Sequence, residues 1–543
     1  MKIVGFHSGH DSSYAVLENG IPKVHIELER YSRRKNAIED SINYFEKMDP
    51  DFNNVLHMTT HRGGGFRLYN FMNSYNKLEN FILDKNGSSY ITGHHQAHAA
   101  NAFYTSNFKD ALIITIDGGG IDYPDGTQHS KSNFDKVDSK SIITCTTVWL
   151  GNDNKIKPVD FIPSAIYNVG FYWANTTSKV FGLGTYRDIR GDQAGTVMGM
   201  AALGNPKKYS KYFKNIHDLT KHKNWGPTDY KFLNTEANKS EQNAFDIAAS
   251  LQNETEILIK NFLKKYIEIY KPKNICFSGG VALNCVALGK VFDWFPNIDF
   301  FVDPIPYDGG LSLGSARYLW HHVLDNPRIY NNPQNQTPYL GYTYSKKDIL
   351  DSIELFKDKL NIDYKNDDYV IEVITNKKIV SLFGGPSESG RRALGNRSIV
   401  ADPRFKEIKD IVNEKVKHRQ WFRPFAPSIL REEVSNWFKY DIDSPYMNFV
   451  VPFKENKKHL VPAVVHFDNT ARLQTVTNDL NPWYYNFISL FKKKTKVPIL
   501  LNTSFNDREP IVETPKHAIN CFLNTNIDYL YFRDYGILLS KNK

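Results

Sequence analysis

The sequence predicts an α/β protein built from two domains. Its coarse pattern is a buried apolar strand, a glycine-rich turn and a helix, and this pattern recurs along the chain. At 543 residues the chain is longer than one ordinary domain. Apolar periodicity fades between residues 324 and 344, where Pro, Asn and Gln cluster, so we expect a linker there. The predicted domains are residues 1–335 and residues 345–543.

The expected elements follow one another in chain order. Residues 1–6 and 12–31 predict a strand, a turn with an Asn-Gly hairpin signal, and a second strand. Residues 111–120, ALIITIDGGG, predict a buried strand that ends in an acid and three glycines. Residues 273–292 and 299–323 each predict a strand, a Gly-Gly turn and a helix. Strands of the second region are expected within residues 378–385 and 497–505.

The composition excludes several classes of protein. The chain is 41% hydrophobic and 14% aromatic, enough to fill cores, so it is not a disordered protein. It lacks a run of 18 apolar residues, so no membrane span is expected, and its start lacks the apolar region of a signal peptide. The four cysteines form no C-x-x-C pair, which favours a reducing, cytoplasmic location. The net charge of +9 suits anionic small molecules. No dense basic run appears beyond SRRK at residues 32–35 and FKKKTK at residues 491–496, which disfavours a nucleic-acid partner.

A candidate metal site begins in the stretch GHHQAHAANAF, residues 93–103. His94 and His98 are four residues apart, so on a helix they project from the same face and could bind one metal ion. Asp117 and Asp308 end two predicted strands, and imidazoles with carboxylates suit Fe, Mn or Zn. The alternative is a pair of ordinary core histidines and two turn acids, and the residue pattern alone leaves both interpretations open.

Three glycine-rich turns form a candidate phosphate-binding cradle. They are DGGG with Gly118 and Gly119, SGGVALN at residues 278–284, and DGGLSLG at residues 308–314. Glycine allows close backbone approach to a phosphate, and the N–H groups of a helix N-terminus favour an anion. Ordinary helix-entry turns use the same residues, so packing remains the alternative. Residues 5–13, GFHSGHDSS, could add a fourth turn of this kind.

The second half carries a basic and polar set of segments. Arginines and lysines stand among small polar residues in four places: residues 388–398, 416–428, 466–476 and 501–510. Guanidinium groups match phosphate and carboxylate oxygens in a bidentate manner, so converging arginines would build an anion pocket. Solvated surface charge is the alternative.

At this point the residues carry a resemblance that runs nearly from end to end. The ordered motifs are HDSSYAVLENG, ELERYSRRKN, HHQAHAANAFYTS, IDGGG, VMGMAALG, FSGGVALNC, DGGLSLGSA, ESGRRALGNRSIVADPR, RPFAPSI, DNTARLQTV and LNTSFNDREPIVETP. The chain resembles the O-carbamoyltransferase family that includes nodulation-factor and aminoglycoside-antibiotic carbamoyltransferases. The resemblance favours the metal interpretation of the histidine pair.

The resemblance implies a fold and a reaction. The N-terminal part is expected to be a Kae1-like domain of the actin/sugar-kinase/Hsp70 fold, and the C-terminal part a YrdC-like α/β domain. Carbamoyl phosphate and ATP are expected to give carbamoyl adenylate in the YrdC-like domain. The Kae1-like domain would then transfer the carbamoyl group to an acceptor hydroxyl. The implied metal is a divalent ion, with Fe2+ favoured over Mn2+ or Zn2+, and Mg2+ can accompany the ATP.

The resemblance also carries roles to matching residues. The implied metal ligands are His94, His98, Asp117 and Asp308. The implied phosphate-holding pairs are Lys417 with Arg419 and Ser504 with Asn506, and further anion contacts are Arg392, Arg397 and Arg423. The implied adenylate-binding turn includes Gly279, Gly280 and Asn284, beside the phosphate cradle of Gly118 and Gly119. The implied catalytic groups near the acceptor are the base His10 with its neighbour Asp11, and Lys35.

The chain departs from the family pattern at four positions. Thr196 stands where the family has a lysine, in GTVMGMA instead of GKVMGLA. Ser389 and Arg391 replace Phe and Pro in SGRRALG, which would reshape the entrance of the carbamoyl phosphate pocket. Asn36 stands where His is common, which would fit a different acceptor.

The acceptor and the partners are the open part of the prediction. A sugar, an antibiotic, a lipo-oligosaccharide or a hydroxymethyl nucleotide would all fit, and we expect residues 74–89 and 160–184 to recognise it. No membrane partner is expected, nucleic acid is disfavoured, and a homodimer is compatible with the sequence. The alternatives are threonylcarbamoyl transfer to tRNA adenosine and a non-catalytic nucleotide-binding protein.

Overall fold

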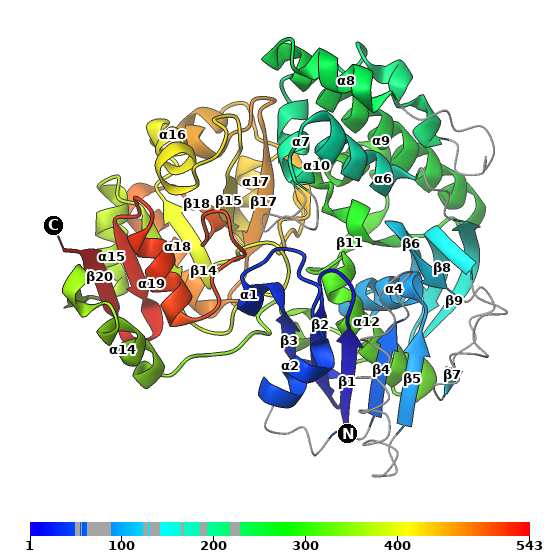
Figure 1. The fold of residues 1–543 in the computed structure, drawn as a ribbon, viewed down its shortest axis with the longest axis horizontal. Helices are drawn as coiled ribbons and strands as arrows, with labels where there is room; N and C mark the ends of the chain where they lie inside the picture. Colours follow the sequence, from blue (N-terminus) through cyan, green and yellow to red (C-terminus); the bar gives the residue numbers. More distant parts are fainter. Residues whose placement is uncertain are drawn as a thin grey trace. The chain divides into compact units, whose positions relative to one another are not determined.

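The chain folds into two compact units (Figure 1). The computed structural model describes residues 1–48, 55, 57–61, 88–122, 129–130, 142–163, 168–184, 193–217 and 229–542. Unit 1 comprises Met1–Ala287 and Val291–Gln336, and unit 2 comprises Leu288–Lys290 and Thr337–Lys543. The boundary at residue 336 falls within the segment in which a linker was expected, residues 324–344.

The first sheet of unit 1 combines an antiparallel hairpin pair with parallel strands. Its strand order is β3-β2-β1-β4-β5-β7. β1 pairs antiparallel with β2, and β2 with β3, whereas β1 pairs in parallel with β4, and β4 with β5. The strand bounds are β1 (Lys2–His7), β2 (Ser13–Glu18), β3 (Ile21–Glu27), β4 (His57–His61), β5 (Ser88–Thr92) and β7 (His129–Ser130). The apolar runs of β1 and β2 are almost wholly buried, as expected for strands covered on both faces.

The second sheet of unit 1 repeats the topology of the first. Its order is β11-β10-β6-β8-β9, with antiparallel β6/β8/β9 and parallel β6/β10/β11. In both sheets the first strand lies between a two-strand antiparallel extension and two parallel strands. The strand bounds are β6 (Asp110–Asp122), β8 (Ile142–Asn152), β9 (Lys155–Pro163), β10 (Asn274–Ser278) and β11 (Asp299–Val302). This duplication is consistent with the actin/sugar-kinase-like fold expected for the N-terminal part.

Two helices pack between these sheets and against each other. α12 (Leu311–Tyr318) contacts β1, β2 and β4, whereas α4 (His94–Thr105) contacts β6, β8 and β10. The two helices cross so closely that a Cβ at Gly314 would lie 2.0 Å from the carbonyl oxygen of Ala97. Every residue of α4 is buried, including the three histidines of its first turns. The predicted helix therefore exists, and it begins at His94.

Four further helices of unit 1, α6 to α9, gather in one group (Figure 1). α9 (Glu241–Tyr270) is the longest, begins after the N-cap Ser240 and packs against α7 (Ala194–Ala201) and α8 (Tyr230–Ala237). α6 (Val169–Asn175) continues into a π-helical turn, Thr176–Val180, which contacts α8. Shorter helices are α1 (Glu29–Ser32), α2 (Ser41–Met48), α10 (Cys285–Gly289), α11 (Val291–Trp294) and α13 (Pro333–Gln336). Among the described helices, none has both the length and the apolar character needed to cross a membrane.

Unit 2 is built on one mixed sheet of nine strands, ordered β12-β20-β19-β13-β14-β18-β15-β17-β16. The bounds are β12 (Leu360–Tyr364), β13 (Val380–Phe383), β14 (Arg397–Ala401), β15 (Ala426–Leu430), β16 (Phe449–Pro452), β17 (Thr470–Val476), β18 (Ile499–Ser504), β19 (Tyr529–Phe532) and β20 (Ile537–Lys541). Its helices are α14 (Lys346–Glu354), α15 (Asp367–Thr375), α16 (Glu407–Ile411), α17 (Val434–Trp437), α18 (Pro482–Thr495) and α19 (Pro515–Leu523). The predicted strands 378–385 and 497–505 contain β13 and β18. The predicted α/β class is confirmed in both units.

Candidate functional site

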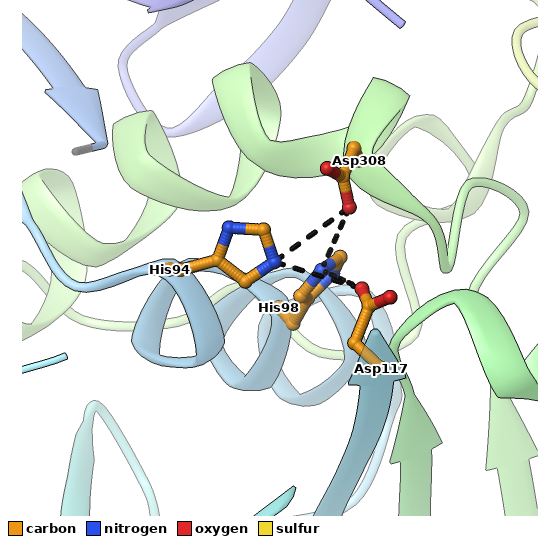
Figure 2. Close-up of side chains that lie close together, drawn as sticks. All are labelled: His94, His98, Asp117 and Asp308. Atoms are coloured by element: carbon orange, nitrogen blue, oxygen red, sulfur yellow. Dashed lines mark ion pairs between the residues drawn. The ribbon is translucent and has the colours of Figure 1, made fainter. Parts of the chain in front are cut away.

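Two histidines and two aspartates from three elements converge in unit 1 (Figure 2). His94 and His98 project from α4, Asp117 from β6, and Asp308 from the 3-10 turn Asp308–Gly310 that precedes α12. His98 Nε2 lies 3.0 Å from Asp117 Oδ2 and 3.5 Å from Asp308 Oδ1, and His94 Nε2 lies 3.6 Å from each of these oxygens. One ligand atom from each of the four side chains lies within 4.8 Å of all the others. The structure therefore brings the whole predicted ligand set to one point.

The electrostatics of this cluster are those of a cation site. Burial opposes the charge on Asp117, but the adjacent His94 and His98 hold the pKa of this carboxyl well below its usual value. Burial likewise opposes the imidazolium of His98, but Asp117 and Asp308 raise the pKa of His98 to about 10. His98 Nε2 and Asp117 Oδ2 are both buried and lie 3.0 Å apart without hydrogen-bond geometry. Two imidazole nitrogens and two carboxylate oxygens held in this way fit a divalent ion of the Fe, Mn or Zn kind.

Asp122, which sequence reasoning missed, fixes the first turn of α4. Its Oδ1 accepts from the backbone N–H of His95 at 2.8 Å and of Gln96 at 3.3 Å, so it satisfies two free donors of the helix N-terminus. Its Oδ2 lies 2.6 Å from His95 Nδ1. Because Asp122 and Asp117 lie on the same strand, the cap holds the histidine-bearing helix against the strand that supplies a carboxylate.

Glycines let the backbone approach the cluster. A Cβ at Gly120 would lie 2.1 Å from Cγ of His94, and one at Gly280 would lie 3.0 Å from Oδ1 of Asp117. Gly279 has a φ of +90°, and a Cβ there would lie 2.3 Å from the carbonyl oxygen of Ile116. These contacts favour a packing role for the Gly279-Gly280 turn beside the end of β6.

The two glycines after Asp117 form a more open turn. Gly118 has space where a Cβ would stand, and its N–H donates to Oδ1 of Asp117. Its carbonyl accepts from the side-chain amide of Asn168, which also caps α6. Gly119 has a φ of +150°, a backbone conformation that favours glycine.

The Asp308 turn is held by strands of the first sheet. The carbonyl oxygen of Gly309 accepts from Ser13 Oγ and from His25 Nε2, each at 2.8 Å. Tyr307, one residue before Asp308, donates its hydroxyl to Glu27. Ser13 stood in a quoted motif without an assigned role, and no pattern in the sequence singled out His25. These contacts span nearly 300 residues of chain.

His10 lies directly beside the cluster. Its Nε2 is 3.3 Å from Asp308 Oδ2, and its Nδ1 is 2.9 Å from Oδ2 of Asp11, whose φ is +61°. The side chain is 46% exposed, and partial loss of hydration opposes the charge, but Asp308 and Asp11 raise the pKa of His10 to about 9. The structure thus places the predicted base and its neighbour against a predicted metal ligand.

Lys35 lies in the loop that follows α1, where it is half-buried. Residues of this loop are tied to the turn after β1, since Ser12 N donates to the Ala37 carbonyl at 3.2 Å and Glu39 N donates to Ser12 Oγ at 2.8 Å. Asn36, the departure from the family pattern, is buried at a φ of +53° and donates its N–H to Glu29. The loop that carries Lys35 therefore joins the turn that carries His10.

Asn284 is engaged within the protein. Its side-chain amide exchanges hydrogen bonds with Gln252 of α9, at 2.9 and 3.1 Å, and its Oδ1 also accepts from Ala287 N. This reciprocal pair favours a role in joining α9 to the glycine-rich turn. Thr196, the substituted lysine position, is buried in the first turn of α7, and its N–H donates to the Gln193 carbonyl at 2.7 Å.

In unit 2 the two predicted phosphate-holding pairs meet. Lys417, only 3% exposed, donates from Nζ to Asn506 Oδ1 at 2.6 Å and to Ser504 Oγ at 3.2 Å. Ser504 Oγ donates in turn to Asn506 Oδ1 at 2.7 Å. The oxygens of Ser504 and Asn506 are neutral, so these contacts do not cancel the positive charge of the ammonium group.

Arginines gather near this lysine. Burial and then the neighbouring Arg423 and Arg472 hold the pKa of Arg419 well below its usual value. Burial and then Arg392 lower the pKa of Arg423 to about 10. Because positive groups crowd one another here, an anion would stabilise them. Arg472, in the motif DNTARLQTV, was not assigned a role from the sequence. We call the four residues the arginine cluster: Arg392, Arg419, Arg423 and Arg472.

Arg397 is placed differently from the arginine cluster. It is fully buried, its Nη1 donates to the carbonyls of Gly384, Gly385 and Asn396, and its guanidinium lies 3.7 Å from the centre of the Phe383 ring. This placement favours a structural role over the anion contact expected from the motif.

The loop before Arg397 is organised by Glu388, another residue that sequence reasoning missed. One carboxylate oxygen, Oε1, accepts from the backbone N–H groups of Leu394, Asn396 and Arg397 at 2.7 to 3.1 Å. Ser389 donates its N–H to the Pro338 carbonyl at 2.6 Å, and Arg391 is half-buried in the same loop.

Of the stretches expected to recognise the acceptor, residues 74–87 and 164–167 lie outside the described residues.

Comparison with known proteins identifies the family. A model of the carbamoyltransferase N-terminus matches residues 75–317, and one of the carbamoyltransferase C-terminus matches residues 371–539. The chain is 34% identical to nodulation protein NolNO of Sinorhizobium fredii, over 84% of this chain and 64% of that protein, so it spans less than two thirds of that relative. It is 33% identical to nodulation protein NolO of Bradyrhizobium diazoefficiens, over 80% of this chain and 77% of that protein. The crystal structure of T. kodakarensis HypF aligns with 60% of this chain and 48% of the HypF chain, at 12% identity and a TM-score of 0.33. This likeness is too weak to argue from. The chain belongs to the carbamoyltransferase family of enzymes.

Proposed function

We propose that this enzyme is an ATP-dependent O-carbamoyltransferase. Unit 2 would form carbamoyl adenylate from carbamoyl phosphate and ATP, and unit 1 would transfer the carbamoyl group to the hydroxyl of a small molecule. We call His94, His98, Asp117 and Asp308 the His-Asp cluster. The observation that carries the proposal is the position of His10, whose Nε2 lies 3.3 Å from Asp308 of this cluster. A proton acceptor beside a cation site is what transfer to a hydroxyl requires.

The arginine cluster and Lys417 would act in the first step. Carbamoyl phosphate and ATP bring several negative charges into one pocket, and the clustered guanidinium and ammonium groups would stabilise them. Loss of phosphate from carbamoyl phosphate to water leaves carbamate, whose oxygen displaces pyrophosphate from the α-phosphorus of ATP. The product, carbamoyl adenylate, is a mixed anhydride that water destroys, so its use within the same chain would protect it.

His10 would act in the second step. Asp11 accepts from Nδ1, which fixes the tautomer and leaves Nε2 to take the proton of the acceptor hydroxyl as it attacks the carbamoyl carbon. AMP then leaves. The pKa of about 9 in the field of Asp308 would fall once positive charge occupies the cluster, because the carboxylates that raise it would then be neutralised.

The four cluster residues would hold the metal. His94, His98, Asp117 and Asp308 supply two nitrogen and two oxygen donors, which suit Fe2+, with Mn2+ and Zn2+ as alternatives. When bound, the ion would supply Lewis-acid charge to an oxygen of the carbamoyl adenylate. Mg2+ would accompany ATP in unit 2.

Substrate exchange tests the proposal. With ATP and carbamoyl phosphate alone, the protein is expected to release pyrophosphate, and addition of a hydroxyl acceptor should yield AMP and a carbamate ester detectable by mass spectrometry. The acceptor panel would include sugars, an aminoglycoside, a lipo-oligosaccharide and a hydroxymethyl nucleotide. Absence of pyrophosphate with every divalent ion would overturn the proposal. Activity only with bicarbonate, threonine and tRNA would instead establish threonylcarbamoyl transfer.

A further inference from the structure

One buried amide in unit 2 joins three points of the loop that carries Lys417, Arg419 and Arg423. Asn413 lies in the π-helical turn Val412–Val416, which follows α16, and is 1% exposed. Its Oδ1 accepts from Nε of Arg419 at 2.8 Å. Its Nδ2 donates to the carbonyls of Arg423 at 2.9 Å and Trp421 at 3.2 Å. The side chain therefore uses its acceptor and both its donors on a single loop.

This loop has little regular structure to hold it. Residues 417–423 form no helix or strand, and His418 has a φ of +43°. The backbone of Asn413 also takes part, since its carbonyl accepts from Arg419 N at 3.0 Å. Asn413 thus determines where the backbone of the loop runs and where the Arg419 side chain leaves it.

The contact at Nε fixes the direction of the Arg419 guanidinium. A guanidinium is planar, so holding Nε–H on one acceptor sets the plane and the direction of the two terminal nitrogens. The face of the group also lies 4.9 Å from the ring centre of Phe425. Its Nη2 also donates to the Pro424 carbonyl at 3.5 Å. With its plane and these two contacts fixed, Arg419 presents its remaining donors in one orientation.

The amide is also the right chemical group for a site that must keep its charge. A neutral oxygen orients the guanidinium without cancelling its charge, whereas a carboxylate in the same position would compete with an anionic ligand. Orientation by a neutral partner keeps both the geometry and the positive charge available.

We propose that Asn413 is the positioning residue for Arg419. It fixes the orientation in which the Arg419 guanidinium contacts the phosphate groups bound in unit 2. The inference rests on the proposed function in that carbamoyl phosphate and ATP supply those groups. It adds a residue whose effect on the ligand passes entirely through Arg419 and its loop.

Chemical rescue separates positioning from a general effect on the fold. Arg419→Ala should lose pyrophosphate release, and guanidinium ion at a non-denaturing concentration should restore part of it by occupying the vacated position. In the double variant Arg419→Ala/Asn413→Ala the same ion should give no rescue, because the oxygen that would hold it has gone. Equal rescue in both backgrounds would overturn the proposal.

Binding of inorganic pyrophosphate, measured by calorimetry, gives a readout that does not need turnover. Asn413→Ala should weaken this binding by about ten- to a hundredfold, the loss expected for one hydrogen bond to a charged group. In the Arg419→Ala background the additional loss should largely disappear, because the two residues act together. The exposed Asn436→Ala, on α17, is the matched control and should bind as the wild type does.

The design separates failure of this inference from failure of the proposed function. If the wild type releases no pyrophosphate from ATP and carbamoyl phosphate, the proposed reaction fails, yet the binding cycle still decides the role of Asn413. If Asn413→Ala does not fold by circular dichroism, Asn413→Leu, which keeps a similar volume but lacks the acceptor for Arg419 Nε, replaces it and should weaken pyrophosphate binding in the same way. Full affinity in a folded variant at position 413 would show that Asn413 does not position Arg419.

Discussion

The His-Asp cluster of unit 1 and the arginine cluster of unit 2 handle charge in opposite ways. In unit 1, imidazoles lie 3.0 to 3.6 Å from carboxylates, and the raised pKa of His98 lets a proton on this residue balance the acids. In unit 2, like charges crowd together, and the partners at Lys417 and Arg419 are neutral oxygens of Ser504, Asn506 and Asn413. The first arrangement exchanges protons for a cation, whereas the second gains most from an anion.

The two sites also differ in what holds them. The four residues of unit 1 stand on a helix, on a strand and at the start of a helix, and packing between α4, β6 and α12 sets their distances. The basic residues of unit 2 stand largely on loops, which single polar side chains such as Glu388 and Asn413 organise. Substitutions in unit 1 should therefore act mainly on the ion, and those in unit 2 on binding of the anionic substrates.

The largest effect is expected for Asp308→Asn in the His-Asp cluster. The amide removes one anionic donor and one partner of His98 and His10, so we expect metal content by mass spectrometry to fall to background. Transfer to the acceptor should fall with it. Pyrophosphate release from ATP and carbamoyl phosphate should persist, because unit 2 carries that step in the proposed function.

The matched control is Asp325→Asn, which makes the same chemical change at an exposed aspartate of unit 1 paired with Lys155. This variant should retain both metal and transfer. Loss of pyrophosphate release in Asp308→Asn to the same extent as transfer would show that the two sites do not divide the chemistry in this way.

A smaller effect is expected for Lys417→Met in unit 2. The substitution keeps the length of the side chain but removes the charge next to Ser504 and Asn506, so KM for carbamoyl phosphate should rise about ten- to a hundredfold. Metal content should not change. The exposed Lys516→Met on α19 serves as the control, and equal losses in both variants would point to a general effect on charge.

Much of the His-Asp cluster could be predicted because local rules specify it. A spacing of four on a helix places His94 and His98 on one face. The expectation that Asp117 and Asp308 end strands was wrong in detail, because Asp117 lies within β6, which continues to Asp122, and Asp308 lies in the 3-10 turn beyond the end of β11 at Val302. The capping residue Asp122 lies 27 residues after His95, whose N–H it accepts, and His25 contacts the Asp308 turn from nearly 300 residues away. Such contacts depend on how elements cross, which no short window of sequence records.

The second half shows a different limit. Arg392 and Arg397 occupy one motif and were assigned the same role, yet Arg397 opens β14 and points into the core. Arg392 lies in the loop before this strand, whereas β14 is buried along its whole length between β13 and β18, so the difference depends on where the strand begins. The repeated topology of the two sheets in unit 1 was also missed, because strand order repeats there without a repeat of residues.

Metal binding should depend on pH in unit 1. The pKa of His98 is raised to about 10, so near neutral pH this ligand carries a proton that an incoming ion must displace. We expect at least one proton to be released per ion, and Mn2+ affinity to rise by up to about tenfold per pH unit between pH 6 and 8. Calorimetry in two buffers of different ionisation enthalpy measures the proton count. A pH-independent affinity would mean that the acids do not hold the imidazole protonated.

The smallest effect is expected for Asp122→Asn, which leaves all four metal ligands in place. The amide can still accept the N–H groups of His95 and Gln96, but it loses the charge opposite His95 Nδ1 and at the N-terminus of α4. Substituting a residue that supports a metal ligand typically lowers metal affinity by about ten- to a hundredfold. Because Asp122→Asn keeps the cap, we expect its Mn2+ affinity to fall by about tenfold. An Asp122→Ala variant, which also loses the cap, should be weaker still in Mn2+ titrations. Equal affinities for wild type, Asp122→Asn and Asp122→Ala would mean that packing of α4 against β6 and α12 alone positions the histidines, and that the cluster needs no polar organiser of the kind unit 2 uses.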